Sequence, residues 1–327
     1  MDKLVKNSRI LVTGGAGFIG SNLTEALLRQ ENEVVVLDNF STGKMENLSA
    51  FREHKNFRLI TGDIRNMDDC RKAVDGIDYV LHQAALGSVP RSVKDPMTST
   101  HVNILGFVNM LFAAQEAEVK RFVYASSSSV YGDSPVLPKV ETQTGTPLSP
   151  YAITKSVNEM YAKNFHDLYG INTVGLRYFN VFGRRQDPFG AYAAVIPKFV
   201  SALLKHESPV INGDGSFSRD FTYIDNVIHA NQCALLAEDS AALNRAYNIA
   251  CGQQITLLQL FAALRDNLAQ FDSAICGIEP EFGPERTGDI PHSLADISNA
   301  RQLLGYQPAC NVEQGIALAA EWYYKNL

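Results

Sequence analysis

The chain has 327 residues, with 35 acidic and 29 basic side chains, a formal net charge of −6, and 46% hydrophobic residues. This balance is typical of a globular protein with a large buried core, built as one large domain or two modest ones. It excludes an intrinsically disordered chain. The basic residues form no block along the sequence, so no nucleic-acid partner is expected.

Cysteine usage and hydropathy bear on the compartment. The cysteines are odd in number, scattered, and never spaced as CxxC; they are Cys70, Cys233, Cys251, Cys276 and Cys310. This pattern predicts free thiols in a reducing, cytoplasmic setting. No apolar run approaches the roughly 20 residues of a spanning helix, and no apolar signal core precedes the first strand, so no membrane role is expected. The histidines lack metal-ligand spacing, and no metal site is predicted.

The first half of the chain alternates short apolar runs with helical patterns. Strands are predicted at 9–13, 33–38, 57–60, 78–82, 121–126 and 172–177. Helices are predicted at 17–30, 96–118 and 150–169. Short buried strands separated by helices indicate βαβ units, so we expect an α/β protein with a doubly wound parallel sheet.

After residue 180 the pattern becomes less regular. Glycine and proline are frequent through 183–219, and helices are predicted near 192–206, 225–238, 256–269 and 312–326. We therefore expect a Rossmann-type domain over 1–180 and a smaller α/β lobe over 181–327. The boundary is expected to be discontinuous, with some later segments returning to the first domain.

A glycine-rich turn follows the first predicted strand. The segment Thr13–Gly20 carries glycines spaced GxxGxxG between a strand and a helix. Residues without a Cβ allow the backbone N–H groups and the positive helix end to approach a pyrophosphate. Asp38 closes the second strand, where a carboxylate binds the ribose hydroxyls of NAD and repels the 2′-phosphate of NADP. The sequence therefore predicts NAD as the cofactor.

Further cofactor contacts are expected where other strands end. Asp63 and Ile64 follow the third strand and are placed beside the adenine, and the small Ala84 and Ala85 let a dinucleotide lie close. The full predicted cofactor set is Gly14, Gly17, Phe18, Ile19, Gly20, Asp38, Asn39, Ser41, Thr42, Gly43, Asp63, Ile64, Gln83, Ala84, Ala85, Tyr151, Lys155 and Tyr178.

A Tyr-x-x-x-Lys pair opens the helix predicted at 150–169. The spacing puts Tyr151 and Lys155 on one helix face. A free phenol has a pKa of about 10, and a nearby ammonium together with a positively charged nicotinamide favours the phenolate. Ser127 ends the fifth strand in a run of serines, so its hydroxyl is expected in the same crevice, where it can bond a sugar oxygen while Tyr151 moves the proton.

Together these motifs resemble the extended short-chain dehydrogenases/reductases that act on nucleotide sugars. The resemblance spans essentially the whole chain and, within that family, is greatest to UDP-hexose 4-epimerases, especially bacterial ones acting on N-acetylated sugars. Its remaining motifs are Asn103 with Gly106, Tyr131-Gly132, Arg177-Tyr178-Phe179-Asn180-Val181 and Arg219-Asp220-Phe221.

The resemblance implies a role for each matched residue. Tyr151 would be the base and acid at O4 with Ser127 sharing the proton relay, and Lys155 would bind the nicotinamide ribose. Tyr178 would pack near the nicotinamide and Asn180 would contact the sugar nucleotide. Arg219 and Arg286 would neutralise the pyrophosphate, a task suited to the planar guanidinium.

The reaction type follows from a missing carboxylate. Relatives that dehydrate or decarboxylate the sugar carry acidic residues beside the catalytic hydroxyl or before Val-Tyr-Gly, whereas residues 127–132 here read Ser-Ser-Ser-Val-Tyr-Gly. Oxidation and re-reduction at C4 need only one base and one hydride carrier. The resemblance therefore implies an isomerase that epimerises C4 through a 4-keto intermediate and serves surface polysaccharide synthesis.

Ser293 and the loop after the fourth predicted strand indicate which sugar the protein binds. Epimerases restricted to plain hexoses carry a bulky tyrosine where this chain has Ser293, and Gly87 and Ser88 resemble the acetamido-specific subgroup. UDP-GlcNAc and UDP-GalNAc are therefore the expected substrates. The predicted substrate set is Gly87, Ser88, Ser127, Ser128, Ser129, Tyr151, Asn180, Val195, Lys198, Asn212, Arg219, Arg286, Asp289 and Ser293.

Three alternatives stay open at this level. A UDP-N-acetylhexosaminuronate 4-epimerase differs only at C6, where a cation such as Arg91 would favour the acid. A UDP-glucose/galactose 4-epimerase is a second. A regulatory NAD-binding protein of the same fold is the third, although such proteins usually lose the tyrosine or the lysine. By analogy with related enzymes, the helices at 96–118 and 150–169 predict a homodimer with a four-helix interface.

Overall fold

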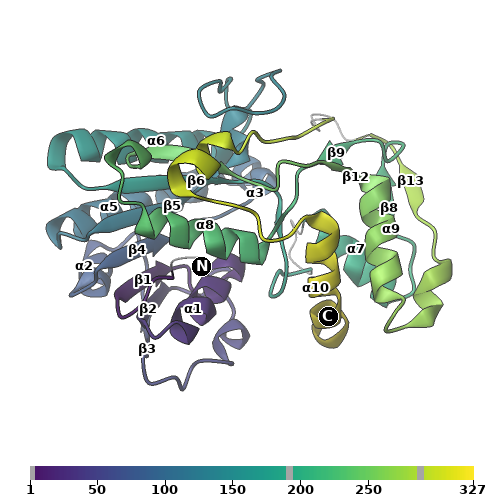
Figure 1. Ribbon diagram of the computed structural model, residues 1–327, viewed down its shortest axis with the longest axis horizontal. Coiled ribbons are helices and arrows are strands. Elements are labelled where there is room, and N and C mark those ends of the chain that lie inside the picture. Colours follow the sequence, from purple (N-terminus) through teal and green to yellow (C-terminus); the bar gives the residue numbers. More distant parts are fainter. Residues whose placement is uncertain (1–3, 189–193, 286–290) are drawn as a thin grey trace.

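The computed structural model describes residues 4–188, 194–285 and 291–327 (Figure 1). Seven parallel strands form one sheet in the order β11-β6-β5-β4-β1-β2-β3. The strands are β1 (Arg9–Thr13), β2 (Glu33–Asp38), β3 (Phe57–Thr61), β4 (Tyr79–His82), β5 (Arg121–Ser127), β6 (Thr173–Tyr178) and β11 (Arg245–Ile249). The predicted α/β fold class with a Rossmann-type parallel sheet is confirmed.

Helices cover both faces of the sheet. Neighbouring residues of a strand point to opposite faces of the sheet. Val12 packs in the hydrophobic core on the face covered by α1 (Phe18–Arg29) and α8 (Ile224–Leu236), and Leu11 packs in the core on the opposite face. The second face is covered by α2 (Met67–Val74), α5 (Gly106–Glu116) and α6 (Pro150–Tyr169). Burial on both sides explains why the strands read as continuous apolar runs.

The helix predicted at 96–118 is present but divided. It comprises α4 (Pro96–Thr100), a π-helical turn η2 (His101–Leu105) and α5. The short α2 and α3 (Val89–Lys94) and the strand β11 were not predicted. β11 mixes polar and apolar residues, and its Asn248 side chain donates to the backbone oxygens of Lys139 and Asp296 rather than lying in an apolar core.

Local sequence signals set both ends of α6. The Ser149 hydroxyl accepts from the Ala152 N–H at 3.1 Å, and Pro150 occupies the first turn, where its missing N–H costs nothing. Gly170 ends the helix with φ of +77°, a conformation that glycine adopts without a Cβ penalty. The helix therefore starts directly after the serine cap, which fixes Tyr151 in its first turn.

The C-terminal part lies beyond the carboxyl ends of the strands, on the right of Figure 1. Its helices are α7 (Val195–Leu204), α9 (Leu257–Leu268) and α10 (Val312–Asn326), close to the ranges predicted. Short strand pairs accompany them: β7 (Val181–Phe182) with β10 (Thr222–Tyr223), β8 (Val210–Asn212) with β13 (Glu281–Gly283), and β9 (Ser218–Arg219) with β12 (Ile255–Thr256). β11 and α8 follow residue 180 yet belong with the sheet; the domain boundary itself stays a prediction.

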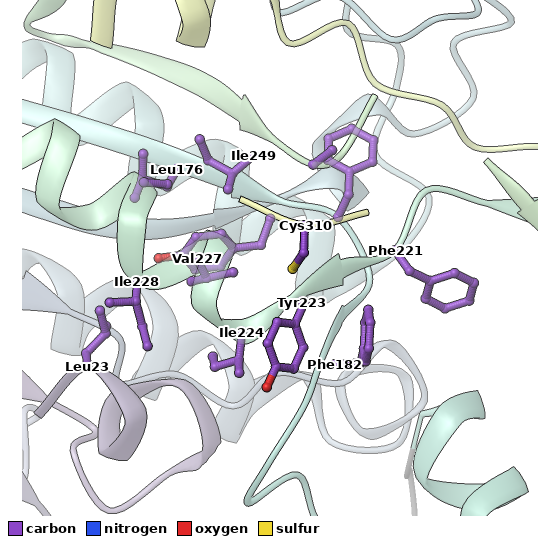
Figure 2. Close-up of a cluster of buried hydrophobic side chains, with 14 of the residues drawn as sticks. Leu23, Leu176, Phe182, Phe221, Tyr223, Ile224, Val227, Ile228, Ile249 and Cys310 are labelled. Atoms are coloured by element: carbon purple, nitrogen blue, oxygen red, sulfur yellow. The ribbon is translucent and has the colours of Figure 1, made fainter. Parts of the chain in front are cut away.

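A continuous core joins the sheet to this C-terminal part. Figure 2 shows Leu176 of β6 and Ile249 of β11 beside Val227 of α8, with Phe182 and Tyr223 of the β7–β10 pair nearby. These side chains are at most a few per cent exposed. The strand ends and the segments that follow them are therefore held in one packed unit. Across the described residues, none of the helices has the length and apolar character needed to cross a bilayer.

Candidate active site

The turn between β1 and α1 brings backbone close to backbone. Gly14 has φ of +67°, and a Cβ added there would lie 2.8 Å from the Cα of Ala84. A Cβ on Gly20 would lie 2.2 Å from the Gly14 carbonyl oxygen, while the Gly17 N–H donates to that oxygen at 3.0 Å. No side chain caps α1 at Gly17, so the N–H groups of its first turn face outward as an anion site.

A cavity of about 260 Å³ extends from this turn along the carboxyl ends of the strands. Every predicted cofactor residue between Gly14 and Ala85 lines it. Leu37, Gly62, Leu86, Gly87 and Val102 also line it and were not in the predicted cofactor set. Val102 comes from the π-helical turn η2, and no local pattern marks a residue in mid-helix as a cofactor contact.

Asp38 lies in this cavity and is only 7% exposed. Its carboxylate accepts from the N–H of Ala16 at 2.9 Å and from the N–H of Phe40 at 2.8 Å. Burial raises the pKa of Asp38, and these two backbone donors oppose the shift. The donors, one of which belongs to the glycine turn, fix the carboxylate at the end of β2, where the ribose of a dinucleotide is expected.

Two other predicted cofactor residues are held by side-chain contacts. Arg65 forms a bidentate pair with Asp63 at 3.0 and 2.7 Å, which lowers the pKa of Asp63 to about 2. The Tyr178 hydroxyl lies 3.3 Å from Gln83 Oε1 and accepts from Asn231 Nδ2 at 2.9 Å. Gln83 lines the cavity, and Tyr178 is tied to the cavity wall through it.

Ser127, Tyr151 and Lys155 meet at the end of β5. Ser127 is the last residue of β5, and its hydroxyl forms a side-chain hydrogen bond with Tyr151. Lys155 Nζ donates to the Ala125 carbonyl at 2.7 Å and lies 5.9 Å from the centre of the Tyr151 ring. Burial raises the pKa of Tyr151, and the bond from Ser127 opposes that shift. Burial lowers the pKa of Lys155 to about 8, with Glu159 opposing.

Residues that were not assigned a role from the sequence hold this group in place. Ser92 Oγ accepts from the Tyr151 N–H at 3.0 Å, and Asn103 Nδ2 lies 3.2 Å from the hydroxyl of Thr154. Glu159 forms a bidentate pair with Arg177 of β6 at 2.9 and 2.7 Å. It also accepts from Ser126 Oγ at 2.5 Å, so α6 is attached to the ends of β5 and β6.

Three predicted substrate residues are linked by the backbone around β9. The exposed Asn180 donates from Nδ2 to the Asp220 carbonyl at 2.9 Å. Arg219 lies on β9, and its guanidinium donates to the carbonyls of Ser218 and Pro291. The half-buried Ser293 donates its N–H to the Ser218 carbonyl at 3.0 Å. The structure thus brings Asn180, Arg219 and Ser293 into one connected region.

The other predicted substrate residues lie in several elements. Val195 and the exposed Lys198 are in the first turns of α7, and Asn212 ends β8. Ser128 and Ser129 follow Ser127 in the short 3-10 helix η3 (Ser128–Tyr131), where Ser129 Oγ is buried without a hydrogen-bond partner among the described residues. Arg286 and Asp289 lie outside the described residues.

A second cavity of about 970 Å³ adjoins the first. The two share Gly17, Phe18, Thr42 and Gly87 in their walls. Ser88 lines the second cavity and caps α3 by accepting from the Arg91 N–H at 3.1 Å. Arg91 lines it as well. Over the described ranges, no group of three or more His, Cys, Asp or Glu side chains is arranged to hold a metal ion.

Comparison with known proteins agrees with this geometry. Residues 10–250 match the NAD dependent epimerase/dehydratase family. The chain belongs to that family. NAD is its cofactor, and the glycine turn and Asp38 fit it. The turn packs so closely on Ala84 that only glycine lets its backbone line the cavity, and the carboxylate lies in the same wall, where a ribose is expected.

Individual relatives cover nearly the whole chain. A putative UDP-glucose 4-epimerase of Methanocaldococcus jannaschii is 37% identical over 97% of this chain and 99% of its own. The structure of a UDP-N-acetylglucosamine 4-epimerase from Methanobrevibacter ruminantium, in complex with UDP-N-acetylmuramic acid, is 41% identical with a TM-score of 0.92, covering 99% and 100% of the two chains. A UDP-glucuronic acid 4-epimerase from Bacillus cereus, with UDP-glucuronic acid and NAD bound, is 32% identical with a TM-score of 0.87, covering 98% and 100%.

Proposed function

We propose that this protein is an NAD-dependent UDP-sugar 4-epimerase whose substrates are UDP-GlcNAc and UDP-GalNAc. The observation that carries the reaction type is the convergence of Ser127, Tyr151 and Lys155 at the end of β5, where residues 127–132 carry no second acid or base. The relatives named above as 4-epimerases of UDP-sugars support it.

The residues act mainly by holding the substrate and moving one proton. Bound NAD supplies the hydride acceptor and donor for C4. Tyr151 takes the O4 proton and later returns it, and the Ser127 hydroxyl, bonded to the phenol, orients O4. The buried Lys155 favours the phenolate by its charge and is placed to bind the nicotinamide ribose. Arg219, with Arg286, neutralises the diphosphate, so the sugar can rotate about a fixed anchor.

The preference for an acetamido sugar rests on small residues. Ser293 leaves room where a tyrosine would fill the space, and Gly87 and Ser88 line the adjoining cavity. The relative from Methanobrevibacter ruminantium, named a UDP-N-acetylglucosamine 4-epimerase, supports this assignment. A uronic acid substrate is the second candidate: Arg91 lines the same cavity as Ser88, and the Bacillus cereus relative is named for UDP-glucuronic acid.

A direct comparison of substrates tests the proposal. Purified protein is given UDP-GlcNAc, UDP-glucose, UDP-glucuronic acid and UDP-N-acetylglucosaminuronic acid in parallel, and the C4 epimers are separated by chromatography. We expect the highest kcat/KM with UDP-GlcNAc. A higher kcat/KM with either acid would identify the protein as a uronate 4-epimerase. A higher kcat/KM with UDP-glucose would identify it as a UDP-glucose/galactose 4-epimerase. No turnover of any of them by NAD-loaded protein would favour the regulatory alternative.

Cofactor retention is the first prediction. Because the reaction regenerates NAD in each cycle and Asp38 is fixed in the cavity wall, we expect NAD to copurify with the protein. Acid denaturation followed by chromatography of the supernatant measures it. A supernatant free of NAD and NADH would contradict the prediction, and one containing NADP would overturn the role given to Asp38.

A homodimer is the second prediction. Helix α6 packs beside α3, α4, η2 and α5, and this group exposes apolar side chains. They include Val93, Met97, Leu105, Ile153, Met160 and Leu168. We expect two copies to bury this surface, because an exposed apolar patch on paired helices is typical of an interface. Light scattering at micromolar concentration should give the mass of a dimer.

A charge within the patch provides the matched test of the dimer. Met160→Glu should shift the protein to monomer, since the carboxylate would be buried against the partner. Leu318→Glu is the control, because Leu318 is 61% exposed but lies on α10, away from this helix group. A monomeric wild-type protein would refute the dimer itself. A dimer that Leu318→Glu disrupts and Met160→Glu does not would show that the interface lies elsewhere.

A further inference from the structure

Asp220 has a fully buried carboxylate at the junction between the sheet and the C-terminal part of the chain. It follows β9 and is 0% exposed. Its Oδ1 accepts from the N–H of Cys251 at 3.0 Å, and its Oδ2 accepts from the N–H groups of Gly252 at 3.1 Å and Ala295 at 3.3 Å. The backbone N–H of Gln253 also donates to the carboxylate.

These contacts join segments that are far apart in the sequence. Cys251 and Gly252 closely follow β11, the edge strand of the central sheet, so their backbone is held close to the end of that sheet. Ala295 lies two residues after Ser293 in a segment that pairs with β9 through the Ser293 N–H. The backbone carbonyl of Asp220 accepts from Asn180, which follows β6. One residue therefore contacts the sheet end, β9 and the 291–297 segment.

The same segments carry the proposed substrate contacts. Arg219 immediately precedes Asp220, and its guanidinium donates to the carbonyl of Pro291 at 3.0 Å. Phe221 follows Asp220, is 3% exposed and lies in the core drawn in Figure 2. Asp220 is thus flanked by a buried aromatic on one side and, on the other, by Arg219, whose guanidinium is bonded to the segment that carries Ser293.

A carboxylate fits this ring of backbone donors better than a side-chain amide would. An ionised carboxylate only accepts hydrogen bonds, and here backbone N–H groups approach both of its oxygens. Burial raises the pKa of Asp220 to about 7, although these donors oppose the shift. If asparagine replaced this aspartate, an NH2 group would stand where one acceptor oxygen stands now. That NH2 group is a donor and would face backbone N–H donors, which would then lack an acceptor beside a buried side chain.

We propose that Asp220 is a positioning residue for the diphosphate end of the UDP-sugar: its carboxylate fixes the loop after β11 and the 291–297 segment against β9, and so sets Arg219, Ser293 and Asn180 in one register before substrate binds. It touches neither the reacting sugar carbon nor the NAD cavity. This inference rests on the proposed function, because it assumes that these residues meet a nucleoside diphosphate.

The test compares Asp220→Asn with wild type in the NAD-loaded protein at pH 8. UDP alone is the probe, and its affinity is measured by calorimetry. We expect UDP affinity to fall about tenfold or more, since a buried charge-assisted contact is lost from the framework of the site. The KM for UDP-GlcNAc should rise with it while kcat stays close to the wild-type value. NAD content should be unchanged, because Asp220 does not line that cavity.

A matched control separates this effect from loss of any aspartate nearby. Asp214 lies in the loop before β9, accepts from the Ser216 N–H at 2.9 Å, and is exposed. Asp214→Asn should leave UDP affinity unchanged. A folded Asp220→Asn protein with wild-type UDP affinity would overturn the inference, as would a fall in kcat at unchanged KM.

Hydrogen exchange in the wild-type protein decides the matter if Asp220→Asn does not fold. Preorganisation requires the N–H groups of Cys251, Gly252 and Ala295 to be protected before UDP is added. Exchange at the rate of exposed loops, with protection only after UDP is added, would overturn the inference. Wild-type protein that binds UDP but does not epimerise UDP-sugars would refute the proposed reaction alone. Protein that epimerises normally with Asp220→Asn would refute only the role of Asp220.

Discussion

Replacing Tyr151 by phenylalanine should lower kcat by at least about a hundredfold, the lower end of what general acid–base catalysis contributes. The substitution removes only the hydroxyl that bonds Ser127 and leaves the ring beside Lys155. The glycine turn and Asp38 are untouched, so NAD content should match that of the wild type. Steady-state kinetics on the preferred UDP-sugar, with NAD measured in the same preparation, gives both results.

A second tyrosine on the same helix provides the control. Tyr161 lies further along α6 and is 38% exposed. Tyr161→Phe removes a hydroxyl from the same helix without touching the site, so its kcat should equal that of the wild type. Near-normal turnover in Tyr151→Phe would remove this phenol from the mechanism. An equal loss in both variants would point to a general effect on α6.

The fold class could be predicted because the strands of a doubly covered parallel sheet are apolar along their whole length. β1 and β2 were found from such runs, and the helix between them from its position after the glycine turn. β11 was not predicted because its five residues mix polar and apolar types without a regular pattern, and its neighbour β6 is distant in the sequence. The π-helical turn within 96–118 leaves the apolar pattern of the helix intact, so the pattern carries no sign of it.

The site residues fall into the same two groups: those that a local sequence pattern marks and those that it does not. The glycine turn, Asp38 and the Tyr151–Lys155 pair are local patterns whose spacing is set by one strand end or one helix. The structure places the first two in one cavity wall and the pair at the end of β5. Ser92, Glu159 and Asp220 act through contacts with segments that lie far away in the chain. Such contacts depend on how the elements pack, and a single sequence does not show them.

Ser293→Tyr makes the sharpest claim about the substrate. The backbone here is fixed, since the Ser293 N–H donates to the Ser218 carbonyl at 3.0 Å and the neighbouring His292 ring lies 2.8 Å from Ser218 Oγ. With the backbone held, we expect a tyrosine ring at this position to occupy the space proposed for the acetamido group. Overpacking of this kind costs roughly 1–3 kcal/mol or more. That is about ten- to more than a hundredfold in kcat/KM for UDP-GlcNAc, at about 1.36 kcal/mol per factor of ten.

The contrast between substrates is what tests this role. UDP-glucose and UDP-galactose lack the acetamido group, so their kcat/KM should be spared or should rise in Ser293→Tyr. Ser293→Ala is the matched control: it keeps the side chain small and should retain the wild-type preference. Parallel losses on acetylated and plain sugars would show that Ser293 does not select between them. Unchanged kinetics on UDP-GlcNAc would show that Ser293 does not line the sugar pocket, and the assignment of an acetamido substrate would then depend on Gly87 and Ser88.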